Sequence, residues 1–231
     1  MFKTRSTNLE RIDTGDYTLA EYAVFLREIA FINRHLGDQR ALRKTLLRDI
    51  ERGRLGEFSL LDVGCGSGEL LRIIADFARD TGRKAKLAGI DLNEISASIT
   101  KSRSSDYPEV SAVRGDAFNL PFADNEFDYA ISSLFFHHLT DEQIPFALKE
   151  MTRVAHRGIV VIDLERSVTA WFLYQLFCLT NRISTLVRQD GSLSIRKGFR
   201  VGEFEKLAGE LGLANAAILR SHPYRVVLSW L

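Results

Sequence analysis

Five short apolar segments alternate with longer helical segments along the middle of the chain. The apolar segments are rich in β-forming residues and cover residues 58–63, 86–91, 110–114, 129–133 and 158–163. Strands that alternate with helices build parallel crossover units, in which the helices pack on the faces of the sheet. The alternation therefore predicts an α/β fold whose parallel strands all end at the same edge.

Both ends of the chain add elements to this pattern. Helical periodicity over residues 16–52, interrupted near residues 37–38, predicts two helices before the first strand. Beyond residue 163 we expect a largely apolar helix over 167–188, a turn at 189–192 and a helix over 202–212. Two closing strands, 216–220 and 225–230, are joined by residues 221–224 alone. A parallel return needs a dozen residues or more, so these strands are expected to form an antiparallel hairpin.

The length of 231 residues fits a single domain, which we divide into four parts. Residues 1–55 are an N-terminal helical cap, 56–163 the ligand-binding core, 164–200 a helical lid insertion, and 201–231 the closing helix and hairpin. A monomer or a homodimer is compatible with this organisation.

Composition excludes several classes of function. Lys and Arg (31) balance Asp and Glu (30), which argues against a nucleic-acid partner and favours a small molecule. The two cysteines, Cys65 and Cys178, lie far apart and indicate neither a disulfide framework nor a metal site. We see no signal peptide, and the longest apolar stretch, 168–179, is shorter than the roughly 20 residues of a membrane span. These features predict a cytoplasmic protein.

A glycine-rich loop follows the first strand. Gly64, Gly66 and Gly68 occupy the first strand-to-helix turn, where glycine allows a positive φ and a close approach of ligand to backbone. The spacing differs from the G-x-G-x-x-G of dinucleotide sites, and Glu69 stands where a phosphate would approach. The loop therefore favours a ligand that carries a carboxylate and an ammonium group but no phosphate, although a tight turn alone would also use small residues.

Acidic residues follow the next two strands at the same edge. Asp91 ends the second strand at a spacing suited to ribose hydroxyls, although it could simply cap the next helix. Asp116 follows the third strand, where it can accept a hydrogen bond from an exocyclic amine or take part in an ordinary turn. Open α/β sheets bind ligands at this edge, so the positions together predict a nucleoside site.

These successive motifs resemble those of the class I S-adenosylmethionine-dependent methyltransferases over residues 58–163. The resemblance implies a Rossmann-like, seven-stranded, mostly parallel sheet with an antiparallel last strand, and S-adenosylmethionine as cofactor with no metal. It also implies donor-binding roles for Asp62, Gly64, Cys65 and Gly66 at the methionine moiety, Asp91 at the ribose, Leu92, Asp116 and Ala117 at the adenine, and Ser132 or Ser133 at the methionine end.

Flanking pieces are similar to a bacterial subgroup associated with polyketide or phenolic-lipid pathways. They include Ile32 to Gly37, Asp163 to Ser167, Asp190-Gly191 and Tyr224-Arg225. This similarity bears on the acceptor and not on the methyl donor.

Two histidines follow the fourth strand. A sulfonium methyl group is already electrophilic, so the protein must chiefly align an acceptor, and one general base suffices for a phenol or a hydroxyl. His137 and His138 are the candidates, because a histidine of ordinary pKa can take a phenolic proton. The alternative is that the pair caps and packs the next helix.

The lid insertion is apolar almost all round, so its helix must be covered on several sides. We expect it to lie over the carboxyl edge of the sheet and to favour an apolar acceptor, while a dimer interface or a membrane-surface contact could use the same side chains. Candidate substrate contacts are Arg34, Glu165, Arg166 and Trp171, and Asp163 shares the location of Glu165 at the end of the fifth strand.

The sequence thus favours O-methylation of a small hydrophobic phenol or polyketide-like compound. A C- or N-methyltransferase and a non-catalytic S-adenosylmethionine-binding protein remain alternatives. A nicotinamide-dependent oxidoreductase is disfavoured by the glycine spacing and by the terminal hairpin.

Overall fold

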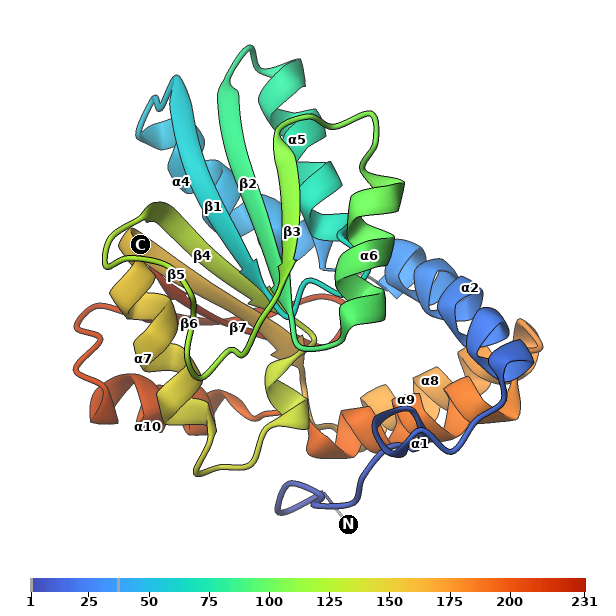
Figure 1. Cartoon of the computed structure of the whole chain (residues 1–231). Helices are drawn as coiled ribbons and strands as arrows, with labels where there is room; N and C mark the ends of the chain where they lie inside the picture. The colour runs from blue at the N-terminus through green and yellow to red at the C-terminus, as the bar shows by residue number, and fades with distance from the viewer. Residues whose placement is uncertain (1, 37) are drawn as a thin grey trace.

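The computed structural model describes residues 2–36 and 38–231, and for Leu19, Ala23, Arg34 and His35 it describes the backbone alone. A seven-stranded sheet of order β3-β2-β1-β4-β5-β7-β6 forms the centre of the molecule (Figure 1). Its strands are β1 (Glu57–Val63), β2 (Lys84–Asp91), β3 (Val110–Arg114), β4 (Phe127–Ser133), β5 (Ala155–Leu164), β6 (Ala217–Ser221) and β7 (Arg225–Trp230).

Strands β1 to β5 are parallel, and β7 runs antiparallel to both β5 and β6. The predicted Rossmann-like sheet and its closing hairpin are therefore confirmed. Because neighbouring residues of a strand point to opposite faces, Leu60 and Leu61 enter two different hydrophobic clusters. Helices α7 (Ile144–Val154) and α10 (Val201–Glu210) cover the face of Leu61, and α5 (Glu69–Asp80) covers the face of Leu60. Helix α6 (Glu94–Arg103) packs against β2 and β3.

The N-terminal region forms the two expected helical stretches. The first is α2 (Leu19–Leu36), and the second runs through α3 (Gln39–Leu42), η1 (Arg43–Leu47) and α4 (Arg48–Arg52). A single-turn helix, α1 (Arg11–Thr14), precedes them. In Figure 1 the strands point towards α1, α2 and the helices of the insertion, so these elements lie beyond the carboxyl edge of the sheet.

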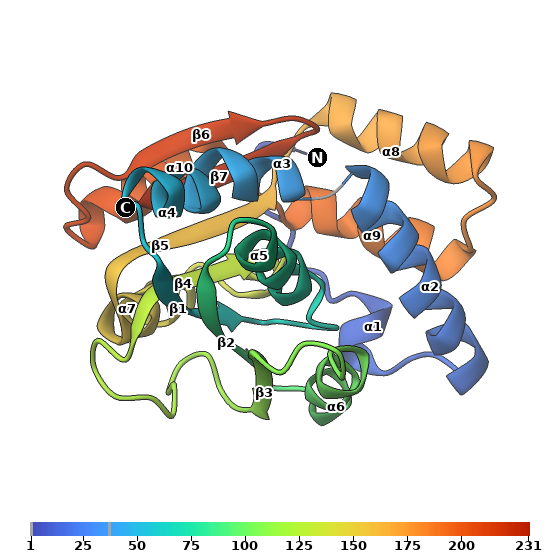
Figure 2. The same cartoon turned by 90° about the horizontal axis from the view of Figure 1, so that it is seen from above.

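The insertion differs from its prediction. It forms two helices, α8 (Val168–Thr180) and α9 (Thr185–Lys197), which lie to one side of the sheet (Figure 2). The predicted turn at 189–192 is wrong, because Asp190 and Gly191 lie within α9. Tertiary contacts explain why both residues are helical. The carboxylate of Asp190 accepts hydrogen bonds from the backbone N–H groups of Arg11 and Ile12, both at 3.0 Å. Gly191 lies where any Cβ would overlap the hydroxyl of Tyr174 in α8.

Among the helices that the structure describes, none is long and apolar enough to cross a membrane.

Candidate active site

A cavity of about 710 Å³ lies at the carboxyl edge of the sheet. At one end it is lined by the glycine loop and by the carboxylates that end β1 and β2, Asp62 and Asp91. At the other end it is lined by side chains of α2, α8 and α9. One continuous space therefore joins the predicted nucleoside site to the helical lid.

The glycine loop brings backbone groups to the cavity wall. Gly64 has a φ of +76°, and a Cβ there would lie 2.6 Å from the ring of Phe135. Gly66 also has a positive φ, but a Cβ there would meet open space. Its N–H donates a hydrogen bond of 2.9 Å to Oδ2 of Asp91. The loop thus presents unobstructed backbone at Gly66 while Gly64 allows it to pack against Phe135, and Cys65 between them is buried.

Asp62 is a buried carboxylate at the cavity wall. Burial, together with the nearby charge of Asp91, raises the pKa of Asp62 to about 7. Within the described part of the chain, no Lys, Arg or His side chain forms an ion pair with it. The carboxylate is therefore an electrostatically unsatisfied group that a cationic ligand would stabilise.

The residues predicted to meet the nucleoside lie around the ends of β2 and β3. Oδ1 of Asp91 accepts a hydrogen bond from the N–H of Asn93 at 2.9 Å, and Leu92 between them is exposed. Asp116 is exposed and accepts a hydrogen bond from the N–H of Phe118, whereas Ala117 is buried. Leu92, Asp116 and Ala117 lie outside the lining of the cavity, next to its Asp91 end along the sheet edge.

The two serines at the tip of β4 have different surroundings. The hydroxyl of Ser132 is buried and donates to the carbonyl of Val63, which joins β4 to β1. Ser133 lines the cavity and donates to Oδ2 of Asp38 at 2.6 Å. Asp38 also pairs with Arg225, and both line the cavity. Of the two predicted serines, only Ser133 faces the candidate ligand space.

His137 and Asp163 form a buried pair beside the cavity. Nδ1 of His137 lies 2.7 Å from Oδ1 of Asp163, and the backbone N–H of His137 donates to Oδ2 of Asp163 at 3.0 Å. Burial raises the pKa of Asp163, but the charge and hydrogen bonds of His137 outweigh that effect and hold the pKa below its ordinary value. An ionised Asp163 accepts from Nδ1–H, which leaves the lone pair on Nε2 of His137.

His138 belongs to a second cluster, built with the N-terminal segment. Its Nδ1 lies 3.2 Å from the carboxylate of Asp13. Burial lowers the pKa of His138, but Asp13 and Glu10 outweigh it and raise the pKa above its ordinary value. The ammonium of Lys197 lies 3.1 Å from Oε1 of Glu10 and 3.5 Å from Asp13. His138 is therefore suited to carry a positive charge.

Glu10, His137 and His138 offer potential metal-ligand atoms within 4.8 Å of one another. The ammonium of Lys197 already supplies a positive charge next to Glu10. Adding a metal ion there would bring two cations together, so the donor set fits a hydrogen-bonded acid–base cluster better than a metal centre.

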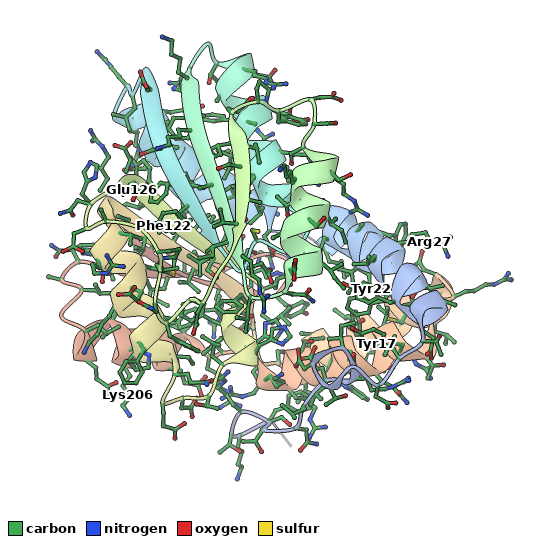
Figure 3. All side chains as sticks on the ribbon, in the orientation of Figure 1. Tyr17, Tyr22, Arg27, Phe122, Glu126 and Lys206 are labelled. Carbon is green, nitrogen blue, oxygen red and sulfur yellow. The ribbon has the colours of Figure 1, made fainter. Side chains whose placement is uncertain are left out.

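Aromatic and aliphatic side chains line the lid end of the cavity. They include Phe25 and Ile29 of α2, and Leu173, Tyr174 and Phe177 of α8. Tyr22 of α2 also lines the cavity and stacks on Tyr17 with ring centroids 5.1 Å apart. Figure 3 shows these two tyrosines together where the N-terminal segment meets α2, whereas Arg27 points away. This end of the cavity accommodates an apolar group.

The four predicted substrate contacts have different locations. The side chain of Arg34 lies outside the described residues. Glu165 lines the cavity and pairs with Arg220 at 2.8 Å. Arg166 is buried outside the cavity, where it pairs with Glu203 at 2.5 Å and donates to the carbonyl of Gly198. Trp171 of α8 is partly buried, packs against a hydrophobic cluster that includes residues of α2 and α9, and does not line the cavity.

Several cavity residues were not expected from the sequence. Glu10 and Asp13 come from the N-terminal segment, more than a hundred positions from the histidines, and no motif marks them. Asp38 and Arg225 likewise meet only through the tertiary fold. The sequence did contain a signal for the pairing of His137 with Asp163, because β4 and β5 are adjacent parallel strands. His137 shortly follows the carboxyl end of β4, and Asp163 lies at the carboxyl end of β5.

Comparison with known proteins supports the assignment of the core. Residues 60–158 match the family model of a methyltransferase domain. The demethylmenaquinone methyltransferases of Bacillus licheniformis and Staphylococcus aureus are 35% and 34% identical over 120 and 125 residues. These alignments cover 52% and 54% of this chain and 50% and 49% of the relatives, so the chain spans about half the length of the curated relatives it matches.

Solved structures share the fold over most of the chain. Magnesium protoporphyrin IX methyltransferase from Synechocystis, with bound S-adenosylhomocysteine, has a TM-score of 0.64 at 16% identity and covers 95% of this chain and 98% of its own. An S-adenosylmethionine-dependent methyltransferase from Aquifex aeolicus has a TM-score of 0.58 at 17% identity and covers 87% of this chain and 96% of its own. Residues 60–158 therefore match a methyltransferase domain, and the chain shares its fold with solved S-adenosylmethionine-dependent methyltransferases.

Proposed function

We propose that this protein transfers the methyl group of S-adenosylmethionine to a small hydrophobic acceptor that carries an ionisable hydroxyl group on a ring. The observation that carries the proposal is the continuity of the cavity. It joins the glycine loop to an apolar chamber, and His137 lies on its wall. A donor and an acceptor can therefore occupy the same cavity, which in-line methyl transfer requires.

The donor fits the loop end of the cavity. The ammonium of the methionine moiety would neutralise Asp62, and its carboxylate would meet the backbone N–H of Gly66. Gly64 and Cys65 would border the methionine moiety, while their own N–H groups donate to the carbonyl of Ile90. Asp91 would accept from the ribose hydroxyls, exchanging its present bond from the N–H of Gly66 for ligand donors. Leu92, Asp116 and Ala117 would border the adenine, and Ser133 would lie near the methionine end.

The His137–Asp163 pair would act as the base. Nε2 of His137 takes the hydroxyl proton, and the ionised Asp163 stabilises the imidazolium that forms. The resulting oxyanion attacks the methyl carbon as the carbon–sulfur bond breaks, and the electron pair of that bond leaves on S-adenosylhomocysteine. Holding the partners in line can supply about 7 to 11 kcal/mol of the barrier, and the base adds roughly 10² to 10⁴ in rate.

A ring oxyanion is nucleophilic at oxygen and also at ring carbons ortho and para to it. The same base therefore serves O-methylation, which we favour from the sequence, and C-methylation. The name of the two curated relatives, which act on demethylmenaquinone, favours a reduced quinone as the second acceptor class. The apolar lining from Phe25, Ile29 and Phe177 suits either kind of acceptor.

A methyl-transfer screen over alkylated phenols and reduced quinones, with the position of the new methyl group read by mass spectrometry and NMR, tests this proposal. We expect His137→Ala and Asp163→Asn to lower kcat by about 10² to 10⁴ while the Kd for S-adenosylmethionine changes by less than about twofold. His156→Ala is the matched control, because His156 is half-exposed and pairs with Asp128 outside the cavity.

Two outcomes would contradict the proposal. Unchanged turnover in His137→Ala would remove His137 as the base. Calorimetric binding of S-adenosylmethionine with no transfer to any ring hydroxyl compound would instead favour a non-catalytic binding protein.

A further inference from the structure

Helix α8 presents an apolar face to the outside of the protein. Val168, Phe172, Leu176 and Leu179 recur at helical spacing and are 59%, 60%, 48% and 69% exposed. The helix contains no charged residue, and the polar residues beside this face are two threonines and Gln175, whose amide is engaged with Ser192 of α9. Most exposed hydrophobic side chains occur singly, so a continuous face of large apolar residues indicates a contact surface.

Arginines flank both ends of this face. At the beginning of α8, Val168 shares a shallow groove with Arg200 and Arg220. At the other end, Arg182 is exposed two residues beyond the end of the helix. Glu165 in the same groove pairs with Arg220 at 2.8 Å and balances its charge. Arg200 and Arg182 form no salt bridge with the residues that the structure describes, so one arginine with an unbalanced charge remains at each end of the apolar face.

We propose that the apolar face of α8 docks on an anionic lipid surface, with Arg182 at one end and Arg200 at the other in contact with lipid headgroups. An apolar face with basic flanks is the pattern of helices that lie in the plane of a membrane interface. With its 13 residues, α8 is too short to span a bilayer and suits a position parallel to its surface.

The charge pattern favours lipid over a second copy of the chain. If two copies paired through α8 about a twofold axis, the arginines at the ends of one helix would face those of the other in either helix orientation. Anionic headgroups instead offer each arginine an opposite charge. Each Lys or Arg close to such a surface strengthens binding by about fivefold.

The docking face is continuous with the cavity. Leu173 is 43% exposed and also lines the cavity, and Phe177, one turn later, lines it too. A hydrophobic acceptor dissolved in the bilayer could then enter past Leu173 with little exposure to water. This last step rests on the proposed function, whereas lipid docking itself does not.

Co-sedimentation with vesicles tests the docking without donor or acceptor. The full chain is mixed with vesicles of phosphatidylcholine alone or of equal parts phosphatidylcholine and phosphatidylglycerol. We expect binding to the anionic vesicles that is at least about tenfold stronger than to the neutral ones and that weakens with added salt. Equal binding to both, or none to the anionic vesicles, would overturn the proposal.

Matched variants locate the contact. Phe172→Gln should weaken anionic-vesicle binding by about tenfold, and Phe172→Gln with Leu179→Gln by more. Phe146 is 61% exposed and belongs to α7, a helix that lies at a distance from α8 in both views (Figures 1 and 2). Phe146→Gln is therefore the control and should bind as the wild type does. Arg182→Gln should lower binding by about fivefold, with Lys206→Gln on α10 as its control.

Circular dichroism and thermal midpoints establish that each variant is folded. Wild-type binding by the Phe172→Gln, Leu179→Gln variant would contradict the proposal. A concentration-dependent dimer that Phe172→Gln dissociates would also contradict it, because the face would then be an interface between copies of the chain. Loss of methyl transfer with normal vesicle binding would bear only on the proposed function.

Discussion

Asp62 destabilises the folded, ligand-free protein, yet its carboxylate is suited to bind a cationic ligand. Its carboxylate is buried without a cationic partner among the described residues, and its pKa is raised to about 7. Below a pH of about 4 both folded and unfolded chains hold the proton, so ionisation costs nothing. As the pH rises towards 7 the unfolded chain ionises first, and the free energy of unfolding falls by about 4 kcal/mol in total.

Asp62→Asn should therefore stabilise the ligand-free protein and weaken donor binding. We expect a higher thermal midpoint than the wild type at pH 8, a gain that shrinks towards pH 4, and a Kd for S-adenosylmethionine about 10- to 100-fold higher. Differential scanning calorimetry and titration calorimetry measure these effects. Asp128→Asn is the control of opposite sign, because Ser59 and Arg157 outweigh burial and hold the pKa of Asp128 below its ordinary value. A lower midpoint for Asp62→Asn at pH 8 would contradict this account.

Whether a cavity residue could be predicted from the sequence depends on whether it lies at the end of a strand. Asp62, Gly64, Gly66 and Asp91 could be placed at the cavity from the sequence because strand ends and turn glycines are local signals. Glu10 could not, because its place beside Lys197 depends on how the N-terminal segment crosses the lid. The physical reason is that a long-range ion pair leaves no periodicity in the sequence.

At the scale of elements, the sheet was predictable and the lid was not. Strands buried on both faces have continuous apolar sequences, which the helices between them make recognisable. In α9, by contrast, Asp190 and Gly191 have the composition of a turn. They are held in a helix by bonds from the backbone N–H groups of Arg11 and Ile12 and by the close approach of Tyr174. Tertiary packing outweighs local propensity there.

Gly191→Ala tests this packing. Alanine normally stabilises a helix interior relative to glycine, but its Cβ would overlap the hydroxyl of Tyr174, so we expect a loss of about 1 to 3 kcal/mol in the free energy of unfolding. Gly209→Ala in α10 is the matched control, since a Cβ there meets nothing within 4 Å, and it should be neutral or stabilising by up to about 1 kcal/mol. Urea titration measures both, and equal stabilisation by the two substitutions would disprove the clash.

At the scale of the whole molecule, the N-terminal segment closes the cavity from outside the sheet. Arg5 holds it in place by donating to the carbonyls of Lys197 and Leu139 and by pairing with Asp141, while its guanidinium lies 4.3 Å from the ring centre of Phe199. The segment then delivers Glu10 and Asp13 to the histidine cluster. Turnover should therefore depend on a segment that lies far from the donor loop.

Arg5→Gln is expected to open this segment without unfolding the sheet. Loss of the charged hydrogen bonds of Arg5 should accelerate chymotrypsin cleavage near Tyr17 by about tenfold. It should also lower kcat/KM, while the Kd for S-adenosylmethionine stays unchanged. Lys3→Gln is the control, because the exposed side chain of Lys3 makes none of these contacts. Wild-type cleavage kinetics in Arg5→Gln would show that other contacts hold the segment.

The continuity of the cavity has a consequence for ligand design. Because Asp62 and Phe177 line one undivided space, a single compound can span both of its ends. An adenosyl amino acid whose sulfur carries a long alkyl or aryl substituent would bind both ends at once, and the second contact would form at a high effective concentration. Such a compound should inhibit more strongly than a donor analogue that fills the Asp62 end alone.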